Sequence, residues 1–299
     1  MMSNLLIIVT VVTILAVAAN GQPPDIAKLT ALASNPKNYE FGNAVSIDLN
    51  WGAVGQIGPP EIGYILFRNA TGPDGWGVWQ QVTAWDGVTS GGFGLSVSLN
   101  DTLAAFGAPT ATAVYVFSKN ATNYWASEVK LTATPAVASS GFGTSVGISF
   151  EYIAVGAPNA GGAVYVFKET SGSWSQQAML ASIGMQATDL FGSSVSISGS
   201  LLLAGAYGRA TKTGSAYVFQ NSGGTWAQVA MLTANDAVSS DWFGYSVAIS
   251  GDIAVIGAPQ KSSNIGAAYV YSSPSWGQLR KLVPAMMMLS VVALITVGQ

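Results

Sequence analysis

Residues 142–167 read FGTSVGISFEYIAVGAPNAGGAVYVF, and this pattern recurs along the chain. Phe-Gly pairs occur five times, at intervals of 52, 49, 49 and 52 residues, namely at Phe41-Gly42, Phe93-Gly94, Phe142-Gly143, Phe191-Gly192 and Phe243-Gly244. A second glycine follows each Phe by 14 positions, at Gly55, Gly107, Gly156, Gly205 and Gly257. Because chance does not hold one spacing five times, the chain is an array of repeats. A period of this size is typical of solenoids and propellers.

Each repeat contains four strand-like segments. In the fourth repeat bulky and small residues alternate from Phe191 to Ser198, which is typical of a strand. The run Leu201–Ala206 is apolar throughout, as in a strand that is buried on both faces. The segments Ala216–Phe219 and Trp226–Leu232 supply the third and fourth strands. Four antiparallel strands per repeat predict an all-β fold, a five-bladed β-propeller with blades starting near residues 41, 93, 142, 191 and 243. We expect the bulky face of each sheet to meet the small face of the next.

The composition excludes several classes of function. Only 8% of the residues are charged and the net charge is −3, so we expect no nucleic-acid partner. Cysteine and histidine are both absent, which excludes Cys-type zinc and iron–sulfur sites, thiolate nucleophiles and an imidazole general base. These absences remove most enzyme mechanisms.

Both ends of the chain are apolar. Residues 1–21 include the uninterrupted run Leu5–Ala19 followed by small residues, which is typical of a secretory signal peptide. A buried strand or an uncleaved anchor is the alternative. The tail, residues 284–299, carries AMMMLSVVALITV and resembles the signal for a GPI lipid anchor. A membrane tail anchor and a packed C-terminus are the alternatives there.

The order of motifs carries a resemblance to a known family. Phe-Gly, Gly-Ala-Pro, Tyr-Val-Phe, Trp and Leu-Thr-Ala follow one another in the manner of the FG-GAP repeat family, which includes the N-terminal propeller of integrin alpha subunits. The resemblance covers about residues 25–283, which leaves residues 22–283 as the propeller domain. Integrin propellers have seven blades and this chain has five repeats, so it resembles the repeat and not an integrin subunit.

The start of the chain also bears on ring closure. Residues 26–32 match the end of a fourth strand, yet they precede the first Phe-Gly pair. A fourth strand at the start could complete the last blade and close the ring. The segment Trp276–Leu282 competes for the same position.

We expect neither a metal, nor a cofactor, nor catalysis. Several integrin blades resemble calcium loops between their first and second strands, but here the corresponding turns have about two residues in repeats two to five, and Asp48–Gly52 in the first repeat supplies too few carboxylates. The 14 acidic residues are scattered over turns and loops. A glycosidase would need two of them facing each other across a cleft.

One edge of the propeller is the candidate binding face. The loops between second and third strands and between successive repeats should share this edge, which in the family resembles the ligand-binding side. The candidate ligand-binding residues there are Trp85, Asp86, Tyr207, Arg209, Lys212, Asp241, Trp242 and Lys261. The alternative is that the tryptophans pack between blades and the charges face water. Three glycosylation sequons, at Asn69, Asn100 and Asn120, belong to the opposite edge.

Together these features predict a secreted or surface-anchored FG-GAP propeller that acts as a binding or adhesion module. Its partners would be a protein or carbohydrate at the cell surface or further copies of itself, with the membrane reached only through the C-terminal tail. A structural subunit of an extracellular filament or coat is the first alternative. A carbohydrate-active enzyme is the second.

Overall fold

The computed structural model describes residues 40–68, 75–181 and 184–284 of the chain. Within these ranges twenty strands form five four-stranded antiparallel sheets, and strands that are consecutive in sequence are neighbours in each sheet. The first two sheets comprise β1 Phe41–Asp48, β2 Trp51–Gln56, β3 Ile62–Arg68 and β4 Trp76–Val82, then β5 Ser96–Leu99, β6 Leu103–Ala108, β7 Ala113–Lys119 and β8 Trp125–Leu131. The third and fourth comprise β9 Ser145–Ser149, β10 Tyr152–Ala157, β11 Ala163–Thr170 and β12 Ser173–Leu180, then β13 Ser194–Ser198, β14 Leu201–Ala206, β15 Ser215–Ser222 and β16 Thr225–Leu232. The fifth comprises β17 Ser246–Ser250, β18 Ile253–Ala258, β19 Ala267–Ser272 and β20 Gly277–Leu282.

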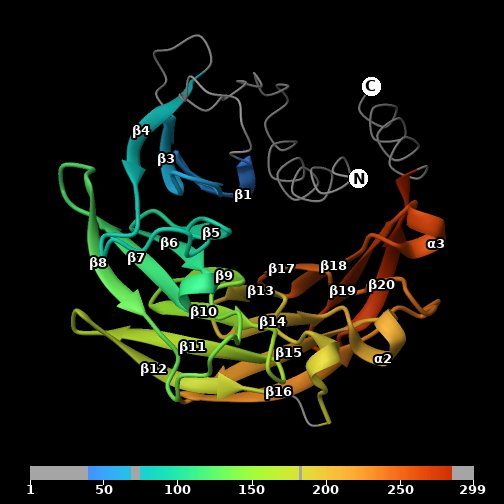
Figure 1. Cartoon of the computed structure of the whole chain (residues 1–299). Coiled ribbons are helices and arrows are strands. Elements are labelled where there is room, and N and C mark those ends of the chain that lie inside the picture. Colours follow the sequence, from blue (N-terminus) through green and yellow to red (C-terminus); the bar gives the residue numbers. More distant parts are fainter. Residues whose placement is uncertain (1–39, 69–74, 182–183, 285–299) are drawn as a thin grey trace, which may run out of the picture.

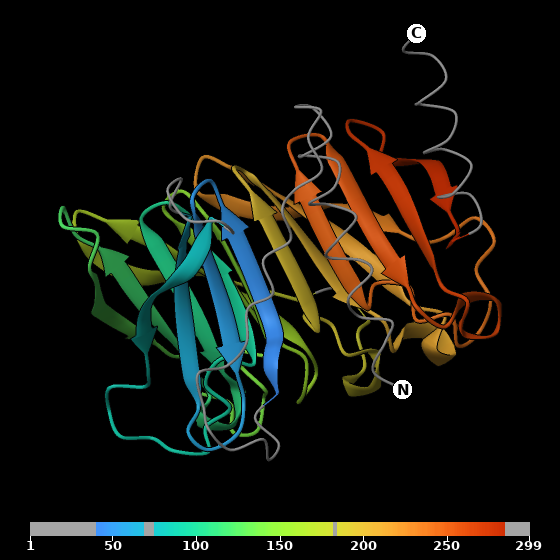
Figure 2. The same ribbon diagram turned by 90° about the horizontal axis from the view of Figure 1, so that it is seen from above.

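These sheets are the five blades of a β-propeller, numbered here one to five in chain order. Figures 1 and 2 show them following one another around an arc, with blade one (blue) and blade five (red) at its two ends. The helical segments that the structure describes are short and lie in loops: η2 Pro109–Ala111, η3 Ala187–Asp189, α2 Arg209–Lys212 and α3 Lys261–Asn264. The described part of the chain contains no helix long and apolar enough to cross a membrane. The predicted all-β, five-bladed architecture is confirmed.

The first hairpin of each blade is tight. Two residues separate the first strand from the second in blades one, three, four and five, and three residues do so in blade two; in blade one Leu49 and Asn50 join β1 to β2. The acidic loop considered for Asp48–Gly52 is therefore absent, because Asp48 ends β1 and Trp51 begins β2. Trp51 is only 3% exposed and belongs to the core instead.

Neighbouring blades approach each other backbone to backbone. A Cβ added to the glycine that lies 14 residues after each Phe would come within 1.9–2.1 Å of the carbonyl oxygen of the next blade's Phe-Gly glycine. This holds for Gly55 with Gly94, Gly107 with Gly143, Gly156 with Gly192 and Gly205 with Gly244. Only glycine allows this approach, because any side chain would overlap the neighbouring backbone. The constant spacing seen in the sequence thus marks the contact that stacks the blades.

The hydrophobic core consists of layers between blades. Each of four large clusters combines residues of two successive blades, and the Phe of every Phe-Gly pair in blades two to five is at most 1% exposed. The expectation that the bulky face of one sheet meets the small face of its neighbour is confirmed at these layers. In blade four the hydroxyl of Ser196, on the small face of β13, accepts a hydrogen bond from the amide of Ile249 on β17 at 3.1 Å.

The fourth position of blade five is occupied by β20. Its residues pair with β19 from Ala268↔Leu282 to Ser272↔Gly277. Of the two segments that competed for this position, the structure therefore places Trp276–Leu282 beside β19. The predictions for residues 1–21, 26–32 and 285–299 fall outside the described residues and stay predictions.

Candidate ligand-binding face

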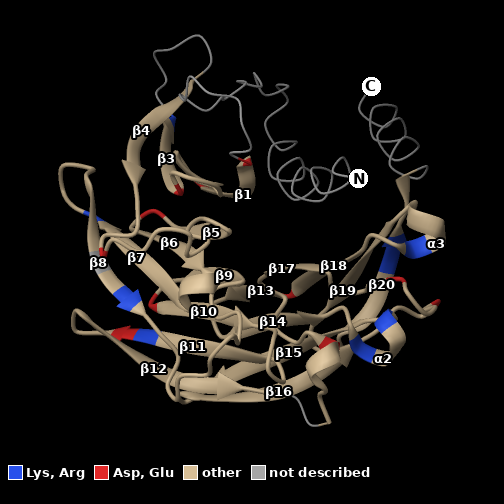
Figure 3. Ribbon diagram, viewed as in Figure 1, with Lys and Arg blue, Asp and Glu red and all other residues tan. Residues whose placement is uncertain are grey.

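The antiparallel order of the strands sorts the connections onto two edges. Turns between first and second strands and between third and fourth strands lie at one edge, the turn face. Loops between second and third strands and between successive blades lie at the other, the loop face. All eight candidate ligand-binding residues lie in loop-face segments: Trp85 and Asp86 between β4 and β5, Tyr207, Arg209 and Lys212 between β14 and β15, Asp241 and Trp242 between β16 and β17, and Lys261 between β18 and β19. In Figure 3 the ribbon is blue, for Lys and Arg, at α2, α3 and β20 of blades four and five.

Trp85 and Asp86 contact blade two. Asp86 accepts hydrogen bonds from the Tyr115 hydroxyl at 2.9 and 3.0 Å and from the Lys130 ammonium. The Lys130 hydrogen bond holds the pKa of Asp86 below its usual value, and the same contact raises the pKa of Lys130. Trp85 packs edge-on against Tyr115 and Phe117, with ring centroids 5.0 and 5.3 Å away. Asp86 therefore satisfies a buried tyrosine and Trp85 packs against blade two, while a role of either residue in ligand binding stays a prediction.

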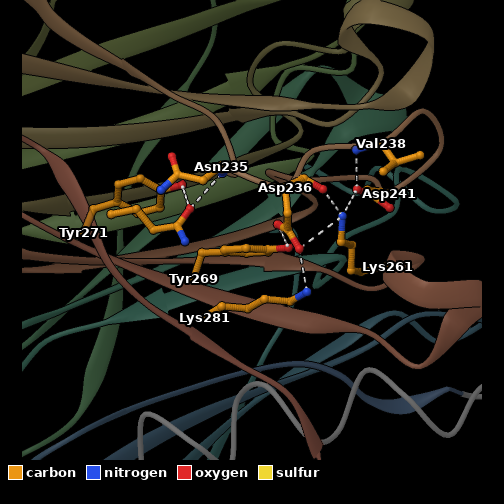
Figure 4. Close-up of polar contacts among 9 residues, drawn as sticks. Asn235, Asp236, Val238, Asp241, Lys261, Tyr269, Tyr271 and Lys281 are labelled. Carbon is orange, nitrogen blue, oxygen red and sulfur yellow. Dashed lines mark hydrogen bonds and ion pairs between the residues drawn. The ribbon is translucent and has the colours of Figure 1, made fainter.

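The same arrangement recurs in blade five around Asp236 (Figure 4). Asp236 accepts hydrogen bonds from the Tyr269 hydroxyl at 2.8 Å and from the Lys281 ammonium at 2.6 Å. Burial alone would raise the pKa of Asp236, but the hydrogen bonds from Lys281 and Tyr269 outweigh it and lower that pKa to about 2. Burial, together with the bond to Asp236, raises the pKa of Tyr269. Asp86 and Asp236 both lie seven residues before a Phe-Gly pair, so the arrangement occupies the same repeat position in blades two and five.

Three further candidates, Arg209, Asp241 and Lys261, are held in ion pairs. Lys261 Nζ lies 2.8 Å from Asp241, and both side chains are less than a tenth exposed. Arg209 pairs with Asp189 at 3.2 Å at the equivalent place in blade four. Both acidic residues stand two positions before a Phe-Gly pair, and Asp241 also accepts a hydrogen bond from the Val238 amide at 2.7 Å. These pairs fasten the loop between the second and third strands of a blade to the turn before the first strand of the same blade.

The remaining candidates, Tyr207, Trp242 and Lys212, lie together with Tyr245 in a group called here the aromatic patch. The ring centroids of Tyr207 lie 5.5 Å from Trp242 and 5.2 Å from Tyr245, and Trp242 stacks on Tyr245 at 5.7 Å. The Lys212 ammonium lies 5.7 Å from the centroid of the Trp242 ring, a cation–π contact. The three rings are each partly exposed and Lys212 is exposed. Burial raises the pKa of Tyr207, so its hydroxyl stays protonated at neutral pH.

Sequence reasoning missed Tyr245 and Asp189. Tyr245 lies two positions after Phe243, where the other repeats have Asn43, Leu95, Thr144 and Ser193, and this exchange of a small or aliphatic residue for a ring was the available signal. Asp189 could have been found from the shared spacing with Asp241. Neither residue belongs to a motif by itself, so the repeat alignment was needed to see them.

Asp86, Asp189, Asp236 and Asp241 on this face are each paired with a cation. Lys261 Nζ lies within 3.5 Å of Asp236 and within 2.8 Å of Asp241, so a lysine separates the two acids. Asp236 is ionised at neutral pH, whereas a general acid requires a raised pKa. Among the described residues no group of three or more acidic side chains is arranged to hold a metal ion.

Two of the three sequons lie on the turn face, as predicted. The Asn100 side-chain oxygen accepts hydrogen bonds from the Thr102 amide at 2.9 Å and from the Leu103 amide at 2.7 Å, in the turn between β5 and β6. The Asn120 side-chain oxygen accepts from the Thr122 amide at 2.9 Å, between β7 and β8. The two asparagines that would carry glycan thus lie in hydrogen-bonded turns. Asn69 lies outside the described residues.

A comparison with protein families agrees with these repeats. The model described as FG-GAP repeat matches three times in succession, over residues 125–167, 174–219 and 226–271. Residues 125–271 of the chain contain FG-GAP repeats. Each match runs from the fourth strand of one blade to the third strand of the next, and blades one and two repeat the same strand order and glycine contacts ahead of the matched region. No curated protein matches the chain.

Proposed function

We propose that this FG-GAP propeller is a binding or adhesion module whose ligand contacts the aromatic patch on the loop face. The observation that carries this proposal is that the rings of Tyr207, Trp242 and Tyr245 pack against one another outside the blade core while remaining partly exposed. Aromatic positions inside the blades are far more buried: Phe191, Phe243 and Tyr217 are at most 1% exposed. The patch therefore offers ring area that blade packing does not use.

The composition of the patch fits a protein or carbohydrate partner. Tyrosine and tryptophan supply a large contact area at low entropic cost, and they dominate the energetics of many interfaces. Lys212 adds a mobile donor beside the Trp242 ring. Because its neighbours Arg209 and Lys261 are held in ion pairs, Lys212 is the basic side chain of these two loops that a ligand could recruit without breaking a buried pair.

We infer a binding role in preference to catalysis. The carboxylates nearest the patch are neutralised by lysine and arginine, and the lowered pKa of Asp236 makes it a poor proton donor. Hydrolysis of a glycoside would need one carboxyl group to carry a proton near neutral pH.

The proposed location is outside the cell, either secreted or anchored at the surface. It is supported by the apolar leader in residues 1–21 and by sequons in turns of one edge. Intact mass and terminal sequencing of the native protein test it, with a mature chain starting near Gln22 and carrying glycan as the expected result. Cleavage of an anchor signal near Ser275 would remove β20, so a lipid-anchored form should retain the chain at least to Leu282. A native chain that begins at Met1 and lacks glycan would contradict the proposed location.

Binding is tested by probing immobilised glycans and purified extracellular matrix proteins with the labelled chain. Replacing Tyr207 and Lys212 together by alanine should weaken binding about tenfold or more, the size of a hot-spot loss. Phe150→Ala is the matched control, because Phe150 is 74% exposed and lies in a turn-face hairpin. Thermal melting of each variant checks the fold. A ligand that binds the double variant as tightly as the original chain would refute the role of the patch.

A further inference from the structure

Serine hydrogen bonds cross all four interfaces between blades. In blades two, three and four the serine three positions after the Phe donates to the carbonyl of the next blade's Phe-Gly glycine: Ser96 to Gly143 at 2.8 Å, Ser145 to Gly192 at 2.9 Å and Ser194 to Gly244 at 2.8 Å. A second serine, five positions after the Phe, accepts from the amide six positions after the next Phe: Ser46 from Leu99, Ser98 from Ile148 and Ser196 from Ile249. Each of the first four blades thus presents a small face with a hydrogen-bonding serine to the bulky face of the next blade.

Blade five has the small face without a blade to receive it. The hydroxyl of Ser246, the next serine in the series, is shielded from solvent and has no hydrogen-bond partner among the described residues. Val255, Ala268 and Val270 on the same face are partly exposed. Their counterparts in blade four are fully buried: Leu203, Ala216 and Val218 are each 0% exposed.

Blade one has the complementary bulky face, also uncovered. Val45 is 44% exposed and Ile47 is 53% exposed, whereas their counterparts Val97 and Leu99 in blade two are 9% and 6% exposed. A Cβ added to Gly42, the glycine of the first Phe-Gly pair, would meet nothing within 4 Å. A Cβ added to the glycine of any other Phe-Gly pair would contact the backbone of the preceding blade. The two terminal blades of one chain therefore carry the two complementary surfaces of an interface between blades.

We propose that blade five of one copy docks on blade one of a second copy. The contacts follow from the equivalent positions in the other repeats. The Ser246 hydroxyl would donate a hydrogen bond to the Gly42 carbonyl, and Ala248 would face Ile47. The Ser250 hydroxyl would accept a hydrogen bond from the Leu49 amide, as the Ser198 hydroxyl accepts one from the Gly251 amide at 3.1 Å. The partner must present the carbonyl of a Phe-Gly glycine beside a row of aliphatic side chains. Blade one of this chain has both features. Within a single chain the four stacked interfaces leave both halves exposed together, which favours the second copy over closure by the chain's own blade one.

The two halves are different surfaces, so the contact is head-to-tail. A heterologous contact of this kind closes into a ring if the rotation allows, and otherwise extends into a filament. It uses the ends of the arc and leaves the loop face free. The proposed ligand-binding role and this assembly are therefore independent and can fail separately.

The test uses two variants of the full chain, each blocked at one end. Ile47→Glu places a charge in the aliphatic row of blade one, and Ala248→Arg places a long side chain where the other blades have serine or glycine. Val229→Glu is the matched control, because Val229 is 46% exposed on β16, the outermost strand of blade four. Light scattering and sedimentation give the molar mass across a concentration series, and circular dichroism melting confirms that each variant is folded.

The unaltered chain and Val229→Glu should form species larger than the monomer as concentration rises. Each blocked variant alone should stay monomeric, while their equimolar mixture should give twice the monomer mass and nothing larger, since each chain keeps one working end. An unaltered chain that is monomeric at every concentration would overturn the proposal in favour of closure within one chain. Blocked variants that assemble like the original, or a mixture that stays monomeric, would overturn it as well.

Discussion

Replacing Gly156 by alanine tests the contact that stacks the blades. Gly156 lies in β10 of blade three, and its backbone approaches the Phe-Gly turn of blade four. The added Cβ would lie 1.9 Å from the Gly192 carbonyl oxygen and 2.2 Å from the Ser145 hydroxyl. Because the nearest obstacle is backbone, rotation of a side chain cannot relieve the overlap. Blades three and four would have to move apart.

The size of the effect follows from these distances. Ordinary contact begins near 3.4 Å, so the carbonyl would have to retreat by 1.5 Å, which is 3.4 minus 1.9. Overpacking of this kind costs about 1–3 kcal/mol, and the hydrogen bond from Ser145 to Gly192 that would be lost is worth about 1 kcal/mol. We therefore expect Gly156→Ala to lower the free energy of unfolding by about 3 kcal/mol. For a chain of this length that corresponds to a fall in Tm of about 6 °C.

Thermal unfolding followed by circular dichroism measures this change. Gly77→Ala is the matched control, because Gly77 also lies in a strand, β4, but an added Cβ there would meet nothing within 4 Å. That control should change the stability by less than about 1 kcal/mol, in the stabilising direction if at all. Equal melting temperatures for Gly156→Ala and the unaltered chain would refute the backbone-contact explanation of the repeated glycine.

Two further predictions concern the charged contacts of blade five. Lys261→Met should destabilise the fold by about 3 kcal/mol in urea unfolding, because it leaves the buried Asp241 carboxylate without its cation. Adding Asp241→Asn should recover part of the loss, and no recovery would argue against the buried pair. The pKa of Asp236 is about 2 when folded against an ordinary 3.8, so its stabilising contribution is complete above pH 4 and is lost as the pH falls through 2. Because the Asp236 side chain is 45% exposed, we expect its contribution to the free energy of unfolding to be about 1 kcal/mol. The variant Asp236→Asn should lack this pH-dependent contribution. If the variant lost the same stability between pH 4 and pH 2 as the unaltered chain, the assignment would be wrong.

The repeat in the sequence was sufficient for the architecture. Phe-Gly spacing, period-two alternation and apolar second strands are local consequences of one supersecondary unit, and each can be read without knowing the neighbours. The alternation from Phe191 to Ser198 even indicated which face of a sheet meets the next. The boundaries of β14 and β16 match the predicted segments closely for the same reason.

The candidate site could be predicted only in part. The sequence located all eight residues at one edge, since strand order alone decides the edge. It could not separate ligand-accessible side chains from structural ones, because that depends on partners far away in sequence. Asp86 binds Tyr115 and Lys130, 29 and 44 residues on, and Lys261 binds Asp241, 20 residues back. Tyr245 became part of the aromatic patch because blade five places it beside Tyr207 of blade four.

The sequence by itself determined the number of blades, their strands and the position of each glycine contact, because these follow from local pattern and period. The tertiary structure decided whether the ends of the array meet. That outcome depends on the rotation accumulated over four interfaces, which no single repeat encodes. Val45 and Val97 occupy the same place in their repeats, yet one is 44% exposed and the other 9%, because only Val97 has a blade stacked against it.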